Sequence, residues 1–299
     1  MSCHSELSLC HEGAWLNLEH ESILVTGGSG TFGRGFVREA LNQGAVRVCI
    51  FSRGEYQQHL MREWFCDDYR LRWMIGDVRD KDRLRRAMQG VDVVIHAAAL
   101  KRIETAHYNP DEVIKTNVSG TMNMLEGAEA SGVRKVVLVS TDKAANPKSV
   151  YGLSKATAES LVIAANNMRS AKGPTYSVCR FGNVWCSTGS IVPRWRALIA
   201  AGAKAVPVTD PECTRFFMRL EEAAALVYRE AMLPDGGRTV IPGLPAYRVS
   251  DLAEAMGVEI RVTGLPQFEK EHETMDGITH SNEVRRMSVD ELRAELLRG

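Results

Sequence analysis

The chain has 299 residues, of which 44% are hydrophobic and 25% charged, and its formal net charge is zero. This length and composition are typical of one large globular α/β domain, or of one domain with a smaller lobe. The balanced charge gives no support to nucleic-acid or anionic-membrane binding, and the longest apolar runs, such as VVIHAAAL, are too short to span a bilayer. No charged-then-apolar leader with a small-residue cleavage site is visible, so we expect a cytoplasmic protein.

The seven cysteines are scattered, and no two are spaced as CxxC. This pattern disfavours a disulfide scaffold or a zinc site and favours reduced, buried thiols. Cys3, His4, Cys10 and His11 could together hold a metal. Residues 1–20 lack strong periodicity, however, so we interpret them as an N-terminal extension and expect no metal.

From residue 21 onward, apolar strands alternate with helices. We expect strands at 22–28, 46–53, 71–78, 91–99, 134–141 and 175–184. We expect helices at 30–44, 81–90, 110–132 and 151–168. This alternation predicts an α/β fold, a doubly wound parallel Rossmann sheet covered on both faces.

The pattern loosens after about residue 185. Helices are expected at 191–202, 221–233 and 249–257, with short strands, loops and prolines between them. This half suits a smaller C-terminal α/β lobe over the carboxyl end of the sheet, where ligands of open α/β sheets bind. We therefore expect an N-terminal extension (1–20), an NADP-binding Rossmann domain (21–185) and a substrate-binding lobe (186–299).

The glycine-rich segment TGGSGTFG follows the first predicted strand and opens the first helix. Gly27 permits the tight turn out of the strand, Gly30 lets the backbone approach a pyrophosphate, and Gly33 lets the helix lie close on the sheet. The helix begins around Thr31 and Phe32, where its free N–H groups and positive dipole end favour phosphate. The segment therefore predicts a dinucleotide site.

The second strand ends in Ser52 and Arg53, where NAD-selective enzymes tend to have Asp or Glu. An arginine suits the 2′-phosphate of NADP, so the sequence favours NADP. NAD stays open if Arg53 is only a solvated surface residue. Further cofactor contacts are expected after the third and fourth strands, at Asp77, Val78, Ala97 and Ala98.

Together with the Tyr-x-x-x-Lys pair Tyr151 and Lys155, these features resemble the extended short-chain dehydrogenase/reductase family. The segments ILVTGGSGTFG, VDVVIHAAALK and STDKAANPKSVYGLSKATAE look like those of the inverting UDP-N-acetylglucosamine 4,6-dehydratases of the polysaccharide-biosynthesis group. The resemblance covers residues 20–220 well, and the Asp-Lys that precedes the tyrosine is its most specific part. It implies an NADP-dependent dehydratase, a lyase, that acts on a nucleotide sugar.

Tyr151 and Lys155 are one helical turn apart, so their side chains face the same way. We expect the Lys155 ammonium to lower the pKa of the Tyr151 phenol from about 10 toward neutrality. Tyr151 could then take the proton of a sugar C4 hydroxyl while hydride passes to the cofactor, with Thr141 bonded to the same hydroxyl. Tyr151 and Lys155 are also expected to contact the cofactor.

Asp142 and Lys143 add a second step. Once C4 is a ketone, the C5 proton is acidic; a base can remove it and an acid can protonate the departing C6 hydroxyl, provided that both pKa values are shifted. The resemblance implies that Lys143 takes the C5 proton, that Asp142 assists the loss of water and that hydride returns to C6. The product would be a 4-keto-6-deoxy sugar inverted at C5. The alternative interpretation of the two residues is a surface ion pair.

The resemblance also implies contacts to the substrate. Asn117 resembles an asparagine that supports the catalytic lysine through a carbonyl and water. Sugar or diphosphate contacts are implied for Lys101, Asn183, Arg215 and Glu269. Pro266 and Thr188 depart from the family, because relatives carry arginine at these positions, so two cationic phosphate contacts are missing from the sequence.

Other activities fit the same residues. A nucleotide-sugar 4-epimerase or 5,6-dehydratase would use the same Tyr151, whereas a non-catalytic NADP-binding sensor would not need it. The helical segments at 112–125 and 156–167 resemble those that form a four-helix dimer interface. We therefore expect a homodimer or a higher homo-oligomer, with no nucleic-acid or membrane partner.

Overall fold

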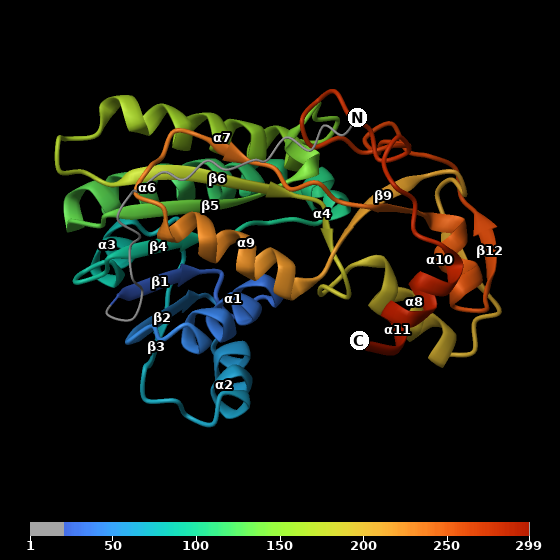
Figure 1. The fold of residues 1–299 in the computed structure, drawn as a ribbon, viewed down its shortest axis with the longest axis horizontal. Coiled ribbons are helices and arrows are strands. Elements are labelled where there is room, and N and C mark those ends of the chain that lie inside the picture. Colours follow the sequence, from blue (N-terminus) through green and yellow to red (C-terminus); the bar gives the residue numbers. More distant parts are fainter. Residues whose placement is uncertain (1–20, 299) are drawn as a thin grey trace, which may run out of the picture.

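The computed structural model describes residues 21–298, in which a large parallel sheet carries a second lobe at its carboxyl end (Figure 1). All six predicted strands of the large sheet form, and a seventh joins them, in the order β10-β6-β5-β4-β1-β2-β3. The strands are β1 (Ser22–Thr26), β2 (Arg47–Ser52), β3 (Leu71–Ile75), β4 (Val93–His96), β5 (Lys135–Thr141), β6 (Thr175–Phe181) and β10 (Thr239–Val240). The predicted N-terminal extension, with Cys3, His4, Cys10 and His11, lies outside the described residues.

Helices cover both faces of this sheet, which confirms the doubly wound α/β prediction. On one face α1 (Thr31–Asn42) and α9 (Leu220–Met232) pack over Ile23 and Val25 of β1. On the other face α3 (Lys81–Ala87), α6 (Gly120–Ser131) and α7 (Val150–Met168) pack over a core that includes Leu24. Successive residues of one strand thus enter opposite cores, which explains why the strands are apolar throughout.

The predicted helix at 110–132 is interrupted. It divides into α5 (Pro110–Ile114), a π-helical turn (Lys115–Ser119) and α6. The π-helical turn contains Asn117, whose buried side chain bonds to both backbone polar groups of Leu100. Such turns are frequent at functional sites, and here the turn anchors the segment after β4.

The structure also adds elements that we did not predict. The helices α2 (Glu55–Trp64) and α4 (Ile103–Tyr108) follow β2 and β4, and a short 3₁₀ turn (Asp142–Ala144) follows β5. The chain returns to the large sheet after residue 185, because α9 packs on α1 and β10 pairs with β6. The expected single boundary at residue 185 therefore separates segments that share one core. The apolar face of α9 does not reveal which core it joins.

The second lobe is a smaller α/β unit. Its two small sheets contain β7 (Asn183–Val184), β9 (Thr214–Met218) and β11 (Ala246–Arg248), and β8 (Ala205–Val208) and β12 (Glu259–Val262). Its helices are α8 (Ile191–Ala200), α10 (Val249–Ala255) and α11 (Val289–Arg298), the last of which we did not predict. They surround a separate core that includes Trp195, Phe217 and Leu292. This confirms the predicted C-terminal lobe.

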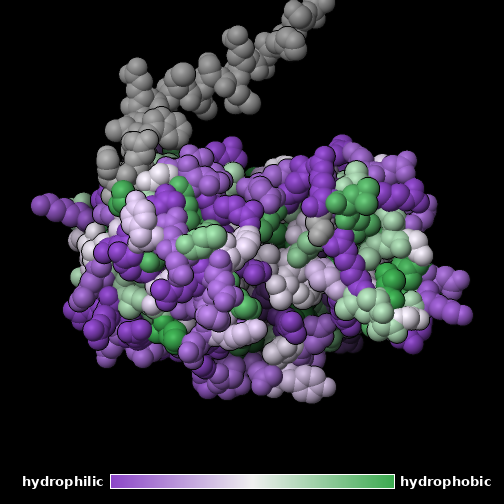
Figure 2. Space-filling model, turned by 90° about the horizontal axis from the view of Figure 1, so that it is seen from below, coloured by the Kyte–Doolittle hydropathy of each residue, from purple (hydrophilic) through white to green (hydrophobic). Residues whose placement is uncertain are grey.

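The face shown in Figure 2 is mainly hydrophilic, with hydrophobic residues in small separate patches. Within residues 21–298, no helix is both long and apolar enough to cross a membrane. The cysteines in this range, Cys49, Cys66, Cys179, Cys186 and Cys213, are free thiols. The same range contains no cluster of three or more His, Cys, Asp or Glu side chains arranged to hold a metal ion.

Candidate active site

A cavity of about 520 Å³ lies at the carboxyl ends of β1, β2, β3 and β4. It is lined by every predicted cofactor residue outside α7, namely Gly27, Gly30, Thr31, Phe32, Gly33, Ser52, Arg53, Asp77, Val78, Ala97 and Ala98. The cavity therefore lies at the switch point of the sheet, between β1 and β4, where the strand order reverses.

The glycines allow close backbone approaches around this cavity. Gly27 has a φ of +67°, and a Cβ added to it would lie 2.9 Å from the backbone of Ala97 and Ala98. A Cβ on Gly33 would lie 2.5 Å from Gly28 Cα, so only glycine lets α1 start this close to the turn. No side chain among the described residues caps the first turn of α1. Its N–H groups are thus suited to a phosphate, and the cavity fits a dinucleotide.

Arg53 is placed to contact an anion in this cavity. Its side chain is 55% exposed, and its guanidinium lies 3.9 Å from Asp77 Oδ2. Asp77 is bound more closely by Arg79, at 2.7 Å, which leaves Arg53 weakly engaged. Ser52, in contrast, accepts hydrogen bonds from Ser29 and Gln58.

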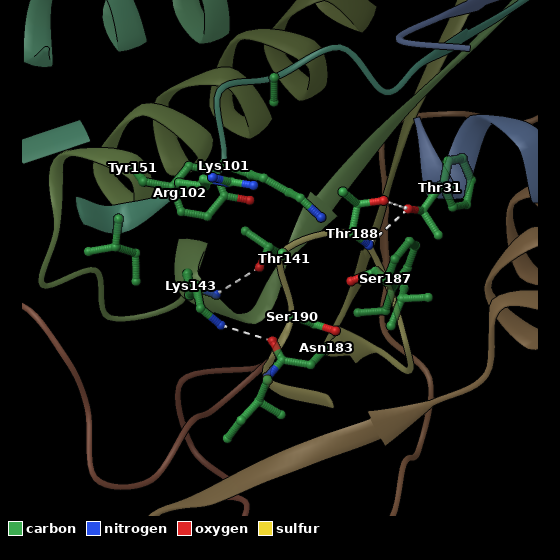
Figure 3. A pocket seen from close by; sticks show the side chains of 18 of the residues that line it. Thr31, Lys101, Arg102, Thr141, Lys143, Tyr151, Asn183, Ser187, Thr188 and Ser190 are labelled. Carbon is green, nitrogen blue, oxygen red and sulfur yellow. Dashed lines mark hydrogen bonds between the residues drawn. The ribbon is translucent and has the colours of Figure 1, made fainter. Parts of the chain in front are cut away.

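A second cavity, of about 370 Å³, adjoins the first through the shared lining residues Thr31, Phe32, Ala97 and Lys101. Its wall brings together four of the five predicted catalytic residues, Thr141, Lys143, Tyr151 and Lys155, and also Asn183 (Figure 3). The fifth, Asp142, is completely buried beside Lys143. β5, the 3₁₀ turn and the start of α7 therefore present one continuous reactive surface.

Tyr151 and Lys155 are both buried at the start of α7. Burial raises the pKa of Tyr151 to about 12, although the charge of Lys143 and a hydrogen bond with Thr141 lower it in part. The expected lowering toward neutrality by Lys155 is therefore wrong for this arrangement. Lys155 Nζ instead donates to the carbonyl of Val139 at 2.8 Å, and burial lowers its own pKa to about 8.

Asp142 is held by two donors and is 0% exposed, so the surface ion pair that we considered is wrong. Its Oδ1 accepts hydrogen bonds from Thr141 Oγ1 at 2.8 Å and from Lys143 Nζ at 3.1 Å. Its Oδ2 has no hydrogen-bond partner within residues 21–298. Burial raises the pKa of Asp142 despite the neighbouring ammonium, which favours a carboxyl group that can carry a proton.

Lys143 reaches from the 3₁₀ turn toward the second lobe. Its Nζ lies 3.1 Å from Asp142 Oδ1, 3.2 Å from Asn183 Oδ1 and 3.4 Å from Glu273 Oε1. Burial acts to lower its pKa, but the charges of Asp142 and Glu273 outweigh burial and raise it. Lys143 is therefore an ammonium at neutral pH in this arrangement.

A third cavity, of about 260 Å³, continues from the second into the lobe and is lined by Lys143, Asn183, Arg215 and Glu269. Arg215 is 7% exposed and donates to Glu269 Oε1 at 2.6 Å and to the carbonyls of Thr214 and Glu271. Much of its hydrogen-bonding capacity is therefore engaged within the lobe. The predicted substrate residues thus line joined cavities, with Lys101 at the cofactor end and Arg215 at the far end.

Two expectations about hydrogen-bond partners need extension. Asn117 donates to Leu100 O and to Ser154 Oγ, and these contacts hold the loop after β4. Support of the lysine through a carbonyl and water stays a prediction. Thr188, noted only for the missing arginine, bonds to Thr31 in the first turn of α1. Its Oγ1 lies 2.8 Å from Thr31 Oγ1, and its N–H donates to that oxygen at 3.0 Å (Figure 3).

Two further buried residues, Tyr247 and Glu273, belong to the site, although neither was predicted as a site residue. Tyr247 in β11 lines both cavities beside the reactive surface and bonds to Asn183. Glu273, in the segment after β12, contacts Lys143 directly. Neither residue lies near STDKAANP in sequence, so no local pattern indicated its position.

The family model described as "Polysaccharide biosynthesis protein" matches residues 23–293. The chain is 42% identical over 258 residues to the inverting UDP-N-acetylglucosamine 4,6-dehydratase of Campylobacter jejuni, which covers 85% of this chain and 77% of that protein. It is 38% identical over 265 residues to the UDP-glucose 4-epimerase of Rickettsia rickettsii, with the same coverage of 85% and 77%.

Among solved structures, Pen from Bacillus thuringiensis matches with a TM-score of 0.89 and 32% identity, covering 94% of this chain and 98% of that one. The family model thus extends over the large sheet and nearly all of the second lobe. The chain belongs to the polysaccharide biosynthesis protein family, within the extended short-chain dehydrogenases/reductases.

Proposed function

We propose that this protein is a nucleotide-sugar 4,6-dehydratase that acts on UDP-N-acetylglucosamine or a close analogue. The observation that carries the proposal is that the buried Asp142 and the partly buried Lys143 form an acid–amine pair beside the same cavity as Tyr151. Oxidation at C4 needs Tyr151, whereas elimination of water needs an additional acid and base. The similarity to the C. jejuni enzyme supports the same activity.

A nicotinamide dinucleotide fits the first cavity. Gly27, Gly33 and the uncapped start of α1 would hold its pyrophosphate, and Ala97 and Ala98 leave room beside the nicotinamide end. When bound, the oxidised nicotinamide would supply the hydride acceptor and a positive charge. We propose NADP in preference to NAD, because the exposed guanidinium of Arg53 suits a 2′-phosphate.

In the first step Tyr151 accepts the proton of the C4 hydroxyl at Oη, while Thr141 positions that hydroxyl. The pKa of about 12 means that Tyr151 is a protonated phenol in this arrangement. It must release this proton to solvent before Oη can accept the proton of the C4 hydroxyl, and a nearby positive charge favours that release. Lys143, whose charge already lowers the pKa of Tyr151, contributes part of this charge. Lys155 holds the start of α7 to the end of β5 through Val139.

In the second step the Asp142–Lys143 pair exchanges a proton internally. Transfer from Lys143 Nζ to Asp142 Oδ1, across 3.1 Å, converts an ammonium and a carboxylate into an amine and a carboxylic acid. The amine can then take the C5 proton, and the acid can protonate the departing C6 hydroxyl. Burial of Asp142 favours the transfer, because it disfavours the carboxylate. Hydride return to C6 and addition of a proton from solvent to C5 would complete a 4-keto-6-deoxy sugar. We propose that this proton adds to the face opposite the one that was deprotonated, which inverts C5.

Mass spectrometry and NMR of the product test this proposal. We expect UDP-N-acetylglucosamine to lose one water and to acquire a C4 carbonyl, and in D₂O to acquire deuterium at C5. A new alkene between C5 and C6 would indicate a 5,6-dehydratase instead. The similarity to the Rickettsia protein makes a 4-epimerase the second candidate, which would give an isomer of unchanged mass from this substrate or from UDP-glucose.

We further propose a homodimer or higher homo-oligomer assembled through α5, α6 and α7. Ile114, Met122 and Leu153 are 43%, 46% and 53% exposed on these helices, and contact with a second copy would cover them. Light scattering after size exclusion tests this, and a monomer at micromolar concentration would contradict it. A cytoplasmic location is proposed because the free thiols, including Cys66, suit a reducing compartment.

A further inference from the structure

The carboxylate of Glu273 lies against Lys143, although the two residues are 130 positions apart in the sequence. Glu273 is 2% exposed and comes from the lobe segment that follows β12. Its Oε1 lies 3.4 Å from Lys143 Nζ, and its Oε2 lies 3.3 Å from Lys270 Nζ. A buried carboxylate that contacts a reactive ammonium influences how that ammonium binds its proton.

Lys270 attaches the same segment to the catalytic turn. Its Nζ donates to the carbonyl of Ala145 at 2.6 Å, directly after the 3₁₀ turn that carries Asp142 and Lys143. Because Lys270 also faces Glu273, the carboxylate is held between two ammonium groups. Its position relative to Lys143 is therefore determined by a contact to the backbone of the turn itself.

The charge balance of this cluster favours an ionised Glu273. Burial alone would raise its pKa, but the charges of Lys143, Arg215 and Lys270 outweigh burial and lower the pKa to about 2. Lys143 is faced by Asp142 and Glu273, by the cations Arg215 and Lys101, and by the phenols Tyr151 and Tyr247. Glu273 and Asp142 are the two acidic groups in this set, and both contact the same ammonium.

We propose that Glu273 is a positioning residue that keeps one proton within the Asp142–Lys143 pair and holds Lys143 Nζ against Asp142. This inference rests on the proposed dehydratase reaction. When two titratable groups interact strongly, the two pKa values at which protons are lost belong to the pair and not to either group alone. The reactive form carries one proton, as an amine beside a carboxylic acid. A fixed negative charge next to the pair raises both of these pKa values. The singly protonated pair therefore persists at neutral and weakly alkaline pH.

The substitution Glu273→Gln removes the charge while keeping the shape of the side chain. Without the neighbouring negative charge, both Asp142 and Lys143 release their protons more readily. Both limbs of the pH profile of turnover should therefore move to lower pH, by about one pH unit. The matched control is Glu271→Gln, which makes the same charge change in the same segment at a side chain that is 52% exposed and faces His272. The control should leave both limbs in place.

A purely structural role would lower the rate without moving the limbs, and that result would overturn the inference. Glu273→Asp keeps the charge, so its pH profile should have both limbs at the wild-type positions, although its turnover should be lower. A shift in this variant as large as that in Glu273→Gln would also contradict the inference.

Thermal unfolding provides a second readout that does not depend on activity. Glu273→Gln removes one of the two carboxylates that face Lys143 and leaves only Asp142, so the melting temperature should fall. The fall should be smaller when Lys143→Met is already present, because the two groups interact directly. Equal falls in both backgrounds would show that Glu273 acts through Lys270 instead. If the wild-type protein removes water from no nucleotide sugar, the proposed function fails, but this coupling still decides whether Glu273 acts on Lys143.

Discussion

The cofactor cavity and the charged cluster around Lys143 are built by different means. The cofactor cavity uses backbone and small side chains from adjacent βα units, with glycines where a Cβ would collide. The charged cluster uses the ends of long side chains, which reach Lys143 from β7, β9 and the segment after β12. The first is formed within the parallel sheet, and the second requires the lobe to pack against that sheet.

This difference assigns cofactor binding to the cofactor cavity and the proposed proton transfers to the Lys143 cluster. A phosphate site made of N–H groups keeps its character over a wide pH range, because amides do not titrate. The Lys143 cluster consists of groups whose proton affinities depend on one another and on burial. We therefore expect substitutions in the cofactor cavity to change affinity or stability, and substitutions near Lys143 to change turnover and its pH dependence.

The largest expected effect is that of Tyr151→Phe. Removal of Oη takes away the proposed base for the C4 hydroxyl, so turnover should fall about a thousandfold, within the range for general-base catalysis. Cofactor affinity should change much less. Tyr108→Phe is the control, since Tyr108 is 89% exposed and lies in α4. Retained turnover in Tyr151→Phe would contradict the proposed role of Tyr151 as the base.

Much of the fold could be predicted because its signals are local. Each strand of the main sheet is a short apolar run next to a helix or turn, and each pairs with a neighbour in parallel. The π-helical turn, α11 and the return of α9 and β10 to the large sheet were not predicted. These features depend on contacts between distant segments, such as α9 on α1, that no short window of sequence contains.

The candidate site divides in the same way. Gly27, Gly33 and the STDKAANP segment could be identified because spacing within a few residues defines their roles. Glu273 and Tyr247 could not, because their proximity to Lys143 and Asn183 results from the packing of the lobe. The pKa of Tyr151 was also mispredicted, since helical spacing shows that Lys155 is near but not that it bonds to Val139.

The substitution Gly33→Ala tests how strictly the cofactor cavity depends on its backbone. The new Cβ would lie 2.5 Å from Gly28 Cα, so α1 must shift. We expect the free energy of unfolding to fall by about 1–3 kcal/mol, as for other overpacked sites, and cofactor affinity to fall with it. Gly243→Ala is the control, because a Cβ there meets no atom within 4 Å. Denaturant unfolding and cofactor titration measure both effects, and equal results for the two variants would contradict this account of Gly33.

Arg53→Ala tests the proposed choice of cofactor. Loss of one charge-assisted contact at a half-exposed side chain should weaken NADP binding by about 1.5 kcal/mol, or roughly tenfold. NAD, which lacks the 2′-phosphate, should bind with nearly unchanged affinity. Fluorescence titration of both cofactors measures the difference. If the wild-type protein binds NAD as tightly as NADP, the proposed preference is wrong whatever the variant does.

The smallest expected effect comes from Thr188→Val, which tests whether the two regions are independent. The loop between β7 and α8 touches the cofactor helix through Thr188 and Thr31, and the variant removes the contact between their Oγ1 atoms while the backbone N–H of residue 188 can still donate. Loss of one neutral hydrogen bond, about 1 kcal/mol, should speed cofactor release a few-fold. Thr263→Val removes a comparable hydroxyl, bonded to Val208 O at the small lobe sheet, and should not change release. Equal release rates in the two variants would show that the lobe does not help to retain the cofactor, so that the cavity of the parallel sheet binds it alone.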